Sequence, residues 1–371
     1  MLKPSSGGLS KPMVCNNSPS NGKKISIVVA CRNECKHIHA FTESLLAQDL
    51  RGFDWELIIA DGKSDDGTGE FLSEFARANS RITIIENPFC IVATGLNAAI
   101  RAARGEVILR MDTHSEYARD YVKKCVETLE TSDACNVGGP ARTKAEGLCS
   151  RAIEAAYHSR FSSGGARFHD EHYSGYVDTV PYGCWRKETL LRLGLFDEQL
   201  VRNQDDELNL RLIRAGGKIW QSSDIVSWYH PRTTLSSLFR QYFQYGFWKV
   251  LVIRKHRLPA SWRHLIPGAF VVLNLMLFLA VVTTSVSGPW FALETTTIVW
   301  AALLLSYALA CLASAVFSAR RYGWQLLPYL PQTFAVFHLS YGLGFLAGLI
   351  YWPFARAERP QLGNLFEGDT R

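Results

Sequence analysis

The sequence lacks several features that would assign it to common protein classes. No GxGxxG turn follows the first strand-like run, where ACRNEC stands instead, and this argues against a nicotinamide dehydrogenase. The nine cysteines form no CxxC pair and no regular spacing. This indicates reduced thiols in a cytosolic domain rather than a zinc site or a disulfide framework. Residues 1–23 have no apolar core, so we expect a disordered leader and not a secretory signal.

Charged side chains are also missing from three long runs in the C-terminal third. These runs are Leu265–Leu293, Thr295–Ala319 and Tyr322–Ala355. Each is long enough to cross about 30 Å of hydrocarbon, which takes roughly 20 residues. We therefore expect a transmembrane region of about three spans at 265–355 and a tail at 356–371. The third run contains Pro328 and Pro331, so we expect it to be kinked or partly interfacial.

Basic residues flank these apolar runs unevenly. They lie just before the first run and just after the second: Arg254, Lys255, Arg257, Arg263, Arg320 and Arg321. By the positive-inside rule, the N-terminal domain faces the cytoplasm. Residues 233–264 mix aromatic with basic side chains. They predict an amphipathic interfacial helix with Tyr245, Phe247 and Trp248 at the lipid headgroups, although an ordinary surface helix is the alternative.

The N-terminal part alternates short apolar runs with helical patterns. The expected strands are Ile25–Ala30, Glu56–Ala60, Ile82–Glu86 and Val107–Asp112, and the expected helices are His37–Ala47, Gly67–Ala78 and Val92–Ala103. Such βαβ units predict an α/β fold with a mostly parallel, Rossmann-like sheet. The segment from residue 138 to 231 is less regular and richer in glycine. We assign it to the same domain, which then spans 24–232.

Asp61 stands where the second predicted strand ends, in ADGKSDDGT. Carboxyl ends of parallel strands are where open α/β sheets bind ligands. We expect Asp61 to accept the imide N–H of a uracil while residues Ala30 to Glu34 line the nucleoside. Arg32 or Lys63 would offset phosphate charge. An Asp-Gly pair after a strand is also a common turn, and that reading stays open.

Asp112 and His114 form an Asp-x-His pair at the end of a later strand. If the segment is extended, alternation places both side chains on one side, where they can approach one Mg²⁺ or Mn²⁺ ion. Such an ion would bridge a diphosphate and act as a Lewis acid on the leaving group. The alternative is a loop histidine beside a helix-capping aspartate.

Asp205 opens a helical pattern, DELNLRLIRAGG. Helix capping explains it equally well when it is taken alone. The functional hypothesis makes Asp205 a general base for an acceptor hydroxyl. Because a helix N-terminus lowers a carboxylate pKa, the sequence predicts a weak base.

Taken together, these stretches resemble the family 2 glycosyltransferases with the GT-A fold, over about residues 24–248. The resemblance is carried by SIVVACRNE, IIADGKSDDGT, VILRMDTH, NQDDELNLR and RQYFQYGFWK. With the membrane tail included, it is closest to the succinoglycan-type bacterial exopolysaccharide glycosyltransferases. It implies an inverting, metal-dependent enzyme of the inner membrane. Such an enzyme moves a hexose, such as glucose, from a UDP-sugar to a lipid-linked saccharide, and nucleic acid is not an expected partner.

By position, the resemblance assigns the uracil contact to Asp61, the metal site to Asp112 and His114, and the base to Asp205. Asn97 lies where the family touches the nucleotide-sugar, and Asp112 is expected to reach the donor as well. Some GT-A enzymes take a third metal ligand from the region of His230. The alternative for this residue is a loop histidine packed on its aromatic neighbours.

Two departures from the family pattern concern catalysis and the acceptor. Gln204 stands where a glutamate precedes the base, and Gln244 replaces an arginine that processive synthases use. The second change argues against a processive polymerase. The acceptor contacts are therefore predicted only as Gln241, Gln244 and Trp248. Transfer to a polyprenyl phosphate and a non-catalytic membrane scaffold remain alternative functions.

Overall fold

A computed structural model describes residues 24–355, which form two compact units along the chain. The first unit contains residues 24–142 and 170–229, and the second contains residues 143–169 and 230–355. The predicted leader at 1–23 and the predicted tail at 356–371 lie outside the described residues.

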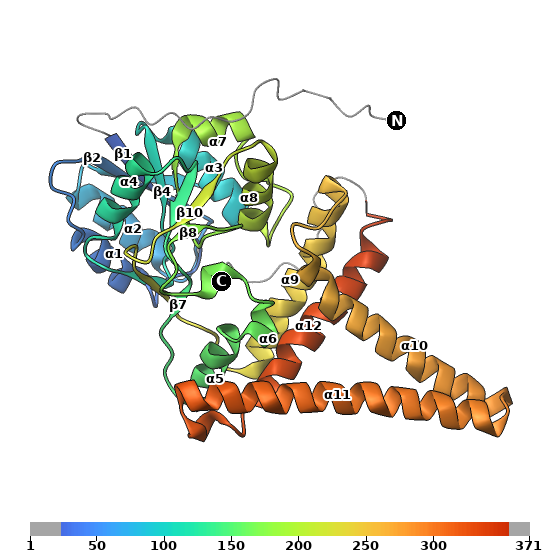
Figure 1. Cartoon of the computed structure of the whole chain (residues 1–371). Helices are drawn as coiled ribbons and strands as arrows, with labels where there is room; N and C mark the ends of the chain where they lie inside the picture. The colour runs from blue at the N-terminus through green and yellow to red at the C-terminus, as the bar shows by residue number, and fades with distance from the viewer. Residues whose placement is uncertain (1–23, 356–371) are drawn as a thin grey trace. The chain divides into compact units, whose positions relative to one another are not determined.

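An eight-stranded sheet forms the centre of the first unit (Figure 1), with the order β3-β2-β1-β4-β9-β6-β10-β8. Its strands are β1 (Lys24–Cys31), β2 (Asp54–Asp61), β3 (Ile82–Glu86), β4 (Val107–Arg110), β6 (Asn136–Gly138), β8 (Gly175–Tyr176), β9 (Cys184–Arg186) and β10 (Ile219–Gln221). The first four pair in parallel, as does β6 with β10, whereas β8 and β9 run antiparallel. The mostly parallel sheet that the sequence predicts is confirmed.

A short antiparallel pair, β5 (Ser115–Tyr117) and β11 (Ser227–Tyr229), lies outside this sheet. The two-residue strand β7 (Arg142–Thr143) lies where the first unit gives way to the second along the chain. The chain thus leaves the end of β4, forms β5, and only later returns to the main sheet.

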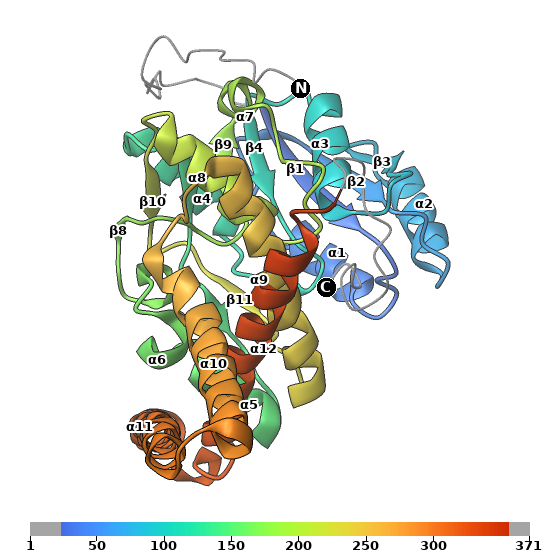
Figure 2. The same cartoon turned by 90° about the vertical axis from the view of Figure 1, so that its right-hand side faces the viewer.

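Helices cover both faces of the sheet (Figures 1 and 2). On one face lie α1 (Ile38–Leu46), α2 (Thr68–Ala78) and α4 (Tyr121–Thr131), and on the other lie α3 (Val92–Ala102), α7 (Lys187–Leu193) and α8 (Gln204–Arg214). Strand alternation explains the two cores: Ile25, Ile27 and Val29 of β1 pack into the first, and Val28 packs into the second. With both faces covered, the carboxyl edge of the strands is the place left for a ligand.

The second unit is helical. It contains α5 (Leu148–Tyr157), α6 (Arg160–Ser163), α9 (Leu235–His256), α10 (Ile266–Ser287), α11 (Trp290–Tyr322) and α12 (Leu330–Tyr351), with 3-10 turns at η1 (Arg167–His169), η2 (Trp262–Leu265) and η3 (Trp324–Leu326). Three helical segments are long and apolar enough to cross a membrane: Trp262–Ser287, Trp290–Tyr322 and Leu330–Tyr351. This agrees with the predicted number of spans. The first turn between them falls at Gly288 and Pro289, so Glu294 lies inside α11.

The prolines of the third apolar run do not kink its helix. Pro328 precedes α12, and Pro331 lies in the first turn, where proline is tolerated because its missing N–H has no helical partner to lose. The helix then runs without interruption to Tyr351. The predicted kink is therefore wrong.

Helix α9 packs along α12 (Figures 1 and 2). The rings of Phe247 and Trp248 are buried, and both centroids lie 5.1 Å from that of Trp352. The Trp352 indole Nε1 donates a hydrogen bond of 2.9 Å to the Phe247 carbonyl. The prediction that Phe247 and Trp248 lie among lipid headgroups is wrong, because they fill the seam between two helices.

Glycines allow this close approach, and one of them gives a test. A Cβ at Gly344 of α12 would overlap the carbonyl of Phe243 on α9. Helix propensity alone would make Gly344→Ala stabilising by about 1 kcal/mol, but overpacking costs ~1–3 kcal/mol. We expect a lower unfolding temperature in detergent for Gly344→Ala. The control is Leu343→Ala at the neighbouring, exposed position. A higher unfolding temperature for Gly344→Ala would contradict this packing.

Candidate active site

The ends of β1, β2 and β4 bring acidic side chains together at one edge of the sheet. Cys31 at the end of β1 is in register with Asp61 at the end of β2. The pKa of the Cys31 thiol is raised above its ordinary value by burial and then by the charges of Glu34, Asp61 and Asp112. These three carboxylates are therefore close enough to one sulfur atom to act on its pKa. The strand-end argument places Asp61 and Asp112 at a common edge, and the geometry agrees.

The loop that follows Asp61 is tied to the loop that follows β1. Asp61 accepts a hydrogen bond of 2.6 Å from the Ser64 hydroxyl and one of 3.3 Å from the Ser64 N–H. Asn33 donates its N–H to Ser64 Oγ at 2.9 Å and accepts from the Asp65 N–H at 3.0 Å. A carboxylate has about four lone-pair positions, so Asp61 keeps capacity for a further donor such as a nucleobase.

The other predicted nucleoside residues lie on these same two loops. Ala30 is half-buried and in register with Ala60 on the neighbouring strand. Arg32 is half-buried over Gly62, where a Cβ would lie 3.1 Å from the arginine side chain. Lys63 is exposed. Together they border the edge of the sheet beside Asp61.

The chain turns after β4 instead of continuing as an extended strand. The His114 N–H donates to Asp112 Oδ1 at 3.0 Å, and the Asp112 N–H donates to the Tyr117 hydroxyl at 2.6 Å. Strand alternation therefore does not apply to Asp112 and His114. The prediction that both side chains lie on one side of an extended segment is wrong, because the aspartate caps the turn that redirects the histidine ring.

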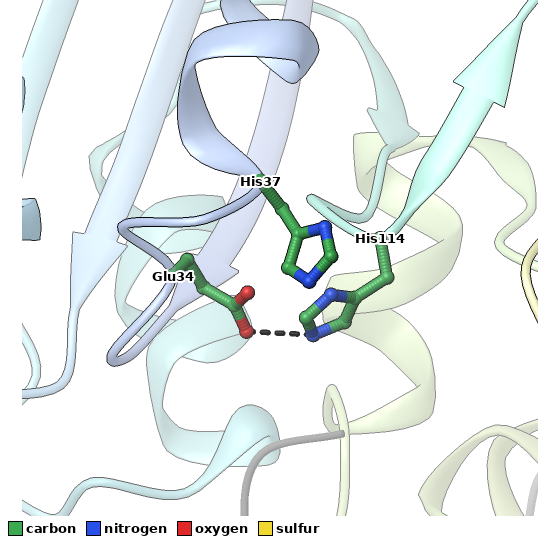
Figure 3. A group of neighbouring side chains, drawn as sticks. All are labelled: Glu34, His37 and His114. Atoms are coloured by element: carbon green, nitrogen blue, oxygen red, sulfur yellow. Dashed lines mark ion pairs between the residues drawn. The ribbon is translucent and has the colours of Figure 1, made fainter. Parts of the chain in front are cut away.

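The His114 ring faces Glu34 and His37 (Figure 3). Its Nε2 lies 2.6 Å from Glu34 Oε1, and its centroid lies 4.9 Å from that of His37 in an edge-on arrangement. One ligand atom from each of the three residues lies within 4.8 Å of the others. Asp112 does not belong to this group. The structure thus separates Asp112 from the group of Glu34, His37 and His114.

Arg110, the last residue of β4, joins Asp112 to Asp205. Its side chain is only 7% exposed, with one guanidinium nitrogen on Asp205 Oδ1 and another 3.8 Å from Asp112 Oδ2. Burial alone would lower the pKa of Arg110, but the charges of Asp205 and Asp112 raise it above its ordinary value. The guanidinium is therefore a fixed positive charge between two carboxylates that lie far apart in the sequence.

The pKa of Asp205 is shifted in the direction opposite to the expected one. Burial raises it, Arg110 partly offsets that rise, and Asp206 and Asp112 raise it further. The predicted lowering of this pKa is therefore wrong, because burial outweighs the effect of Arg110. A raised pKa makes Asp205 a better proton acceptor than an ordinary aspartate.

Asn97 lies on α3 and is buried. Its amide nitrogen donates to the Phe196 carbonyl at 2.8 Å and to Glu198 Oε1 at 3.0 Å, while its oxygen accepts from the Phe196 N–H at 2.9 Å. These bonds fix the loop that leads toward α8. The predicted contact of Asn97 with the nucleotide-sugar remains a prediction.

The remaining predicted residues belong to the second unit. His230 Nδ1 lies 3.1 Å from the Lys144 carbonyl, and Gln241 donates to the Tyr245 hydroxyl at 3.0 Å. Gln244 and Trp248 are buried. The metal role of His230 and the acceptor roles of the two glutamines and the tryptophan stay predictions.

Comparison with known proteins identifies the family. The family model described as "Glycosyl transferase family 2" matches residues 26–185. The succinoglycan biosynthesis protein ExoA of Rhizobium meliloti is 30% identical over 326 residues, which are 87% of this chain and 94% of the relative. The chain belongs to glycosyl transferase family 2. The family resemblance expected from the sequence is confirmed.

Two further comparisons support the architecture of this glycosyltransferase. It is 27% identical to a Methanococcus voltae dolichyl N-acetyl-alpha-D-glucosaminyl phosphate 3-beta-D-2,3-diacetamido-2,3-dideoxy-beta-D-glucuronosyltransferase, over 88% of this chain and 97% of the relative. The solved structure of the mannosyltransferase PcManGT from Pyrobaculum calidifontis, in complex with GDP-Man and Mn²⁺, is similar with a TM-score of 0.55. That likeness has 19% sequence identity and covers 91% of each chain. The GT-A fold is confirmed.

Two residues that lie beside the predicted site residues, Arg110 and His37, were not predicted from the sequence. Arg110 had a signal: it is a single charged residue at the end of the apolar run VIL, where a side chain is expected to be buried. No sequence pattern points to His37, because it meets His114, which is 77 residues later in the chain, only through the folding of two loops.

Arg110→Gln is expected to lower both stability and transfer. Removing one partner of a buried pair costs ~3–5 kcal/mol. Asp112 and Asp205 are 30% and 35% exposed, so we expect less than that. Loss of positioning is expected to slow transfer by about 10²-fold. The measurements are thermal unfolding and turnover. The control is Arg101→Gln, which removes an exposed pair with Glu198. Equal turnover in the two variants would contradict a positioning role for Arg110.

Proposed function

We propose that this protein is an inverting, metal-dependent hexosyltransferase. It transfers a sugar, such as glucose, from a UDP-sugar to a lipid-linked saccharide in exopolysaccharide biosynthesis. The observation that carries the proposal is the position of Arg110, which holds Asp112 and Asp205 together beside the strand ends that carry Asp61. A donor-binding acid and a candidate base are thereby brought to one place, as a single displacement requires.

The donor would be held by residues of the β1, β2 and β4 ends. Asp61 would accept the uracil imide N–H, with Ala30, Arg32 and Lys63 nearby. Asp112 would bind Mg²⁺ or Mn²⁺. Its carboxylate fits this role: Oδ1 accepts one backbone N–H, Oδ2 lies 3.8 Å from Arg110, and the side chain is 30% exposed. When bound, such an ion would neutralise the diphosphate as it leaves.

Asp205 would take the proton of the acceptor hydroxyl. As the acceptor oxygen bonds to the anomeric carbon, the bond from that carbon to the diphosphate breaks, and UDP leaves with the electron pair. The proton passes to Asp205, so the step needs no covalent intermediate. The raised pKa of this carboxyl supports the assignment.

The named relatives support a lipid-linked saccharide acceptor. The Methanococcus voltae relative is named for transfer to a dolichyl-linked N-acetylglucosaminyl phosphate, and ExoA is named for succinoglycan biosynthesis. The first name indicates the extension of an existing glycan and not the loading of a bare polyprenyl phosphate. PcManGT, whose structure holds GDP-Man and Mn²⁺, supports a nucleotide-sugar donor and a divalent ion.

Three candidate spans and the basic residues around them support a multi-pass protein of the cytoplasmic membrane, with the transferase domain in the cytoplasm. The acceptor would then enter from the lipid side, where Gln241, Gln244 and Trp248 were predicted to contact it. His230 is proposed as a further ligand of the donor ion.

A donor panel tests the proposed function. Membranes containing the protein are supplied with labelled UDP-sugars and with GDP-mannose, and label is followed into extracted lipid. We expect one UDP-hexose to label a lipid that carries more than one sugar, with Mg²⁺ or Mn²⁺ required. Label in a lipid with a single sugar would favour the polyprenyl phosphate alternative. Label from GDP-mannose only would contradict the uracil assignment of Asp61.

The pH dependence of transfer should reflect the shifted pKa of Asp205. A base must be ionised to act, so activity falls as the pH drops through its pKa. Because that pKa is raised, the acid limb of kcat/KM should lie above the value of an ordinary aspartate, about 3.9. The measurement is the pH profile of kcat/KM between about pH 4 and pH 8. A profile that stays flat to pH 4 would contradict Asp205 as the base.

A further inference from the structure

The geometry points to a second metal site in the first unit, formed by Glu34, His37 and His114. We infer that these three side chains bind a late first-row divalent ion of the Zn²⁺ type, separately from the Asp112 carboxylate. Glu34 and His114 also carry predicted roles in the transferase assignment, as a nucleoside contact and a donor-ion ligand. The inference rests instead on their grouping with His37 and apart from Asp112.

The ligand atoms converge from two loops (Figure 3). One atom of each residue lies within 4.8 Å of the others. Ligands placed about 2 Å from one tetrahedral ion lie roughly 3–4 Å apart. Binding therefore needs only small movements: His114 Nε2 and Glu34 Oε1, now 2.6 Å apart, would separate slightly, and any wider pair would close. Glu34 is 3% exposed and the His114 side chain is 13% exposed, so the group is largely withdrawn from solvent.

The contact between His114 and Glu34 is close but is not aligned as a hydrogen bond. His114 Nε2 lies 2.6 Å from Glu34 Oε1, yet within residues 24–355 this buried nitrogen has no hydrogen-bond partner of acceptable geometry. An imidazole nitrogen and a carboxylate oxygen are both ligand atoms for a divalent ion, and a bound ion would satisfy the nitrogen. That arrangement fits two ligands of one ion.

The backbone holds the ligands in place. The Glu34 N–H donates to Thr68 Oγ1 at 2.8 Å, and the Glu34 carbonyl accepts from the His37 N–H at 2.8 Å. On the other side, the capped turn at Asp112 fixes the His114 backbone. Glu34 and His37 thus share one tight turn before α1, and His114 comes from a second rigid turn after β4.

The donor set selects the class of ion. Two imidazoles and one carboxylate are the ligands of many zinc sites, whereas Mg²⁺ prefers carboxylate and water. An ion here would join the loop that follows β1 to the turn that follows β4. It would therefore stiffen the two loops that border the strand edge carrying Asp61.

Cobalt titration of the full-length protein in detergent tests the site without a transfer assay. The protein is stripped of metal with a chelator, desalted, and titrated with Co²⁺ in the absence of nucleotide, and the visible absorption of tetrahedral Co²⁺ is followed. We expect one strongly absorbing Co²⁺ per chain. His37→Ala and His114→Ala should each weaken it by more than about 100-fold, because loss of a mere supporting contact already costs 10–100-fold.

Matched variants separate this site from others. His39→Ala removes an exposed imidazole two residues from His37 and should leave Co²⁺ affinity unchanged. Asp112→Asn should also leave it unchanged. His37→Cys keeps a ligand, so it should still bind Co²⁺ and add a thiolate charge-transfer band, even if the alanine variant fails to fold. Absence of tetrahedral Co²⁺ in the natural protein, equal affinity in His37→Ala and His39→Ala, or loss of binding in Asp112→Asn would overturn the inference.

Discussion

Asp205→Asn is expected to lower the rate of sugar transfer by about 10²–10⁴-fold while UDP affinity stays unchanged. Asparagine has nearly the same shape and can still accept a hydrogen bond from Arg110, but it cannot take the proton of the acceptor hydroxyl. The donor contacts assigned to Asp61 and Asp112 lie on other elements and should persist. The measurements are turnover with the preferred UDP-sugar and a UDP titration of the same preparation.

Asp206→Asn is the matched control for this prediction. It removes the same charge from the same first turn of α8, one residue away. Turnover of Asp206→Asn should stay within about threefold of the natural protein, since Asp206 is not proposed to contact donor or acceptor and acts on Asp205 through its charge. If Asp205→Asn also stays within that range, or if both variants lose activity equally, Asp205 is not the base.

Asp112→Ala should abolish the metal-dependent part of UDP binding. The carboxylate is proposed to bind the ion that bridges the diphosphate, and alanine offers no ligand. Loss of a metal ligand should cost more than the 10–100-fold typical of supporting residues. A UDP titration with Mn²⁺ and then with excess EDTA measures the effect. The natural protein should lose affinity in EDTA, and Asp112→Ala should be weak in both conditions.

Asp65→Ala tests whether any acid at this edge of the sheet has the same effect. Asp65 is exposed on the loop after β2, and its N–H, not its carboxylate, makes the bond to Asn33. UDP affinity of Asp65→Ala should remain sensitive to EDTA, as in the natural protein. Equal UDP affinity in Asp112→Ala and the natural protein, with no effect of EDTA on either, would remove the metal assignment.

Much of the fold could be predicted because its signals are local. Strands such as Ile25–Ala30 and Ile82–Glu86 are short apolar runs bounded by helical patterns, and the structure has strands at Lys24–Cys31 and Ile82–Glu86. The membrane helices follow from the absence of charge over lengths that cross a bilayer. The position of Asp61 at the sheet edge follows from strand ends alone.

The parts that could not be predicted depend on tertiary contacts. The redirection of the His114 ring comes from a turn capped by Asp112, and no local pattern distinguishes that turn from a continued strand. Phe247 and Trp248 belong to a segment whose composition predicts an amphipathic helix. Their rings instead pack on Trp352, about 100 residues later. Composition shows that a helix has an aromatic face, but it does not show which other part of the chain packs on that face.

The direction of the pKa shift of Asp205 also could not be predicted from the local sequence. The sequence indicates a helix N-terminus and hence a lowered pKa, whereas burial and the nearby Asp112 and Asp206 raise it. Arg110, which offsets part of that rise, comes from a strand almost 100 residues earlier. The pKa of a side chain depends on its burial and on the charges near it in space, and both are known only from the folded structure.

The anomeric configuration of the product decides whether the sugar is transferred in one displacement with Asp205 as the base. The measurement is the NMR coupling of the anomeric proton in the glycan formed from an α-linked UDP-hexose. A single displacement inverts the centre, so the account predicts a β-linked product. An α-linked product would require a covalent intermediate or another route, and it would contradict the role given to Asp205.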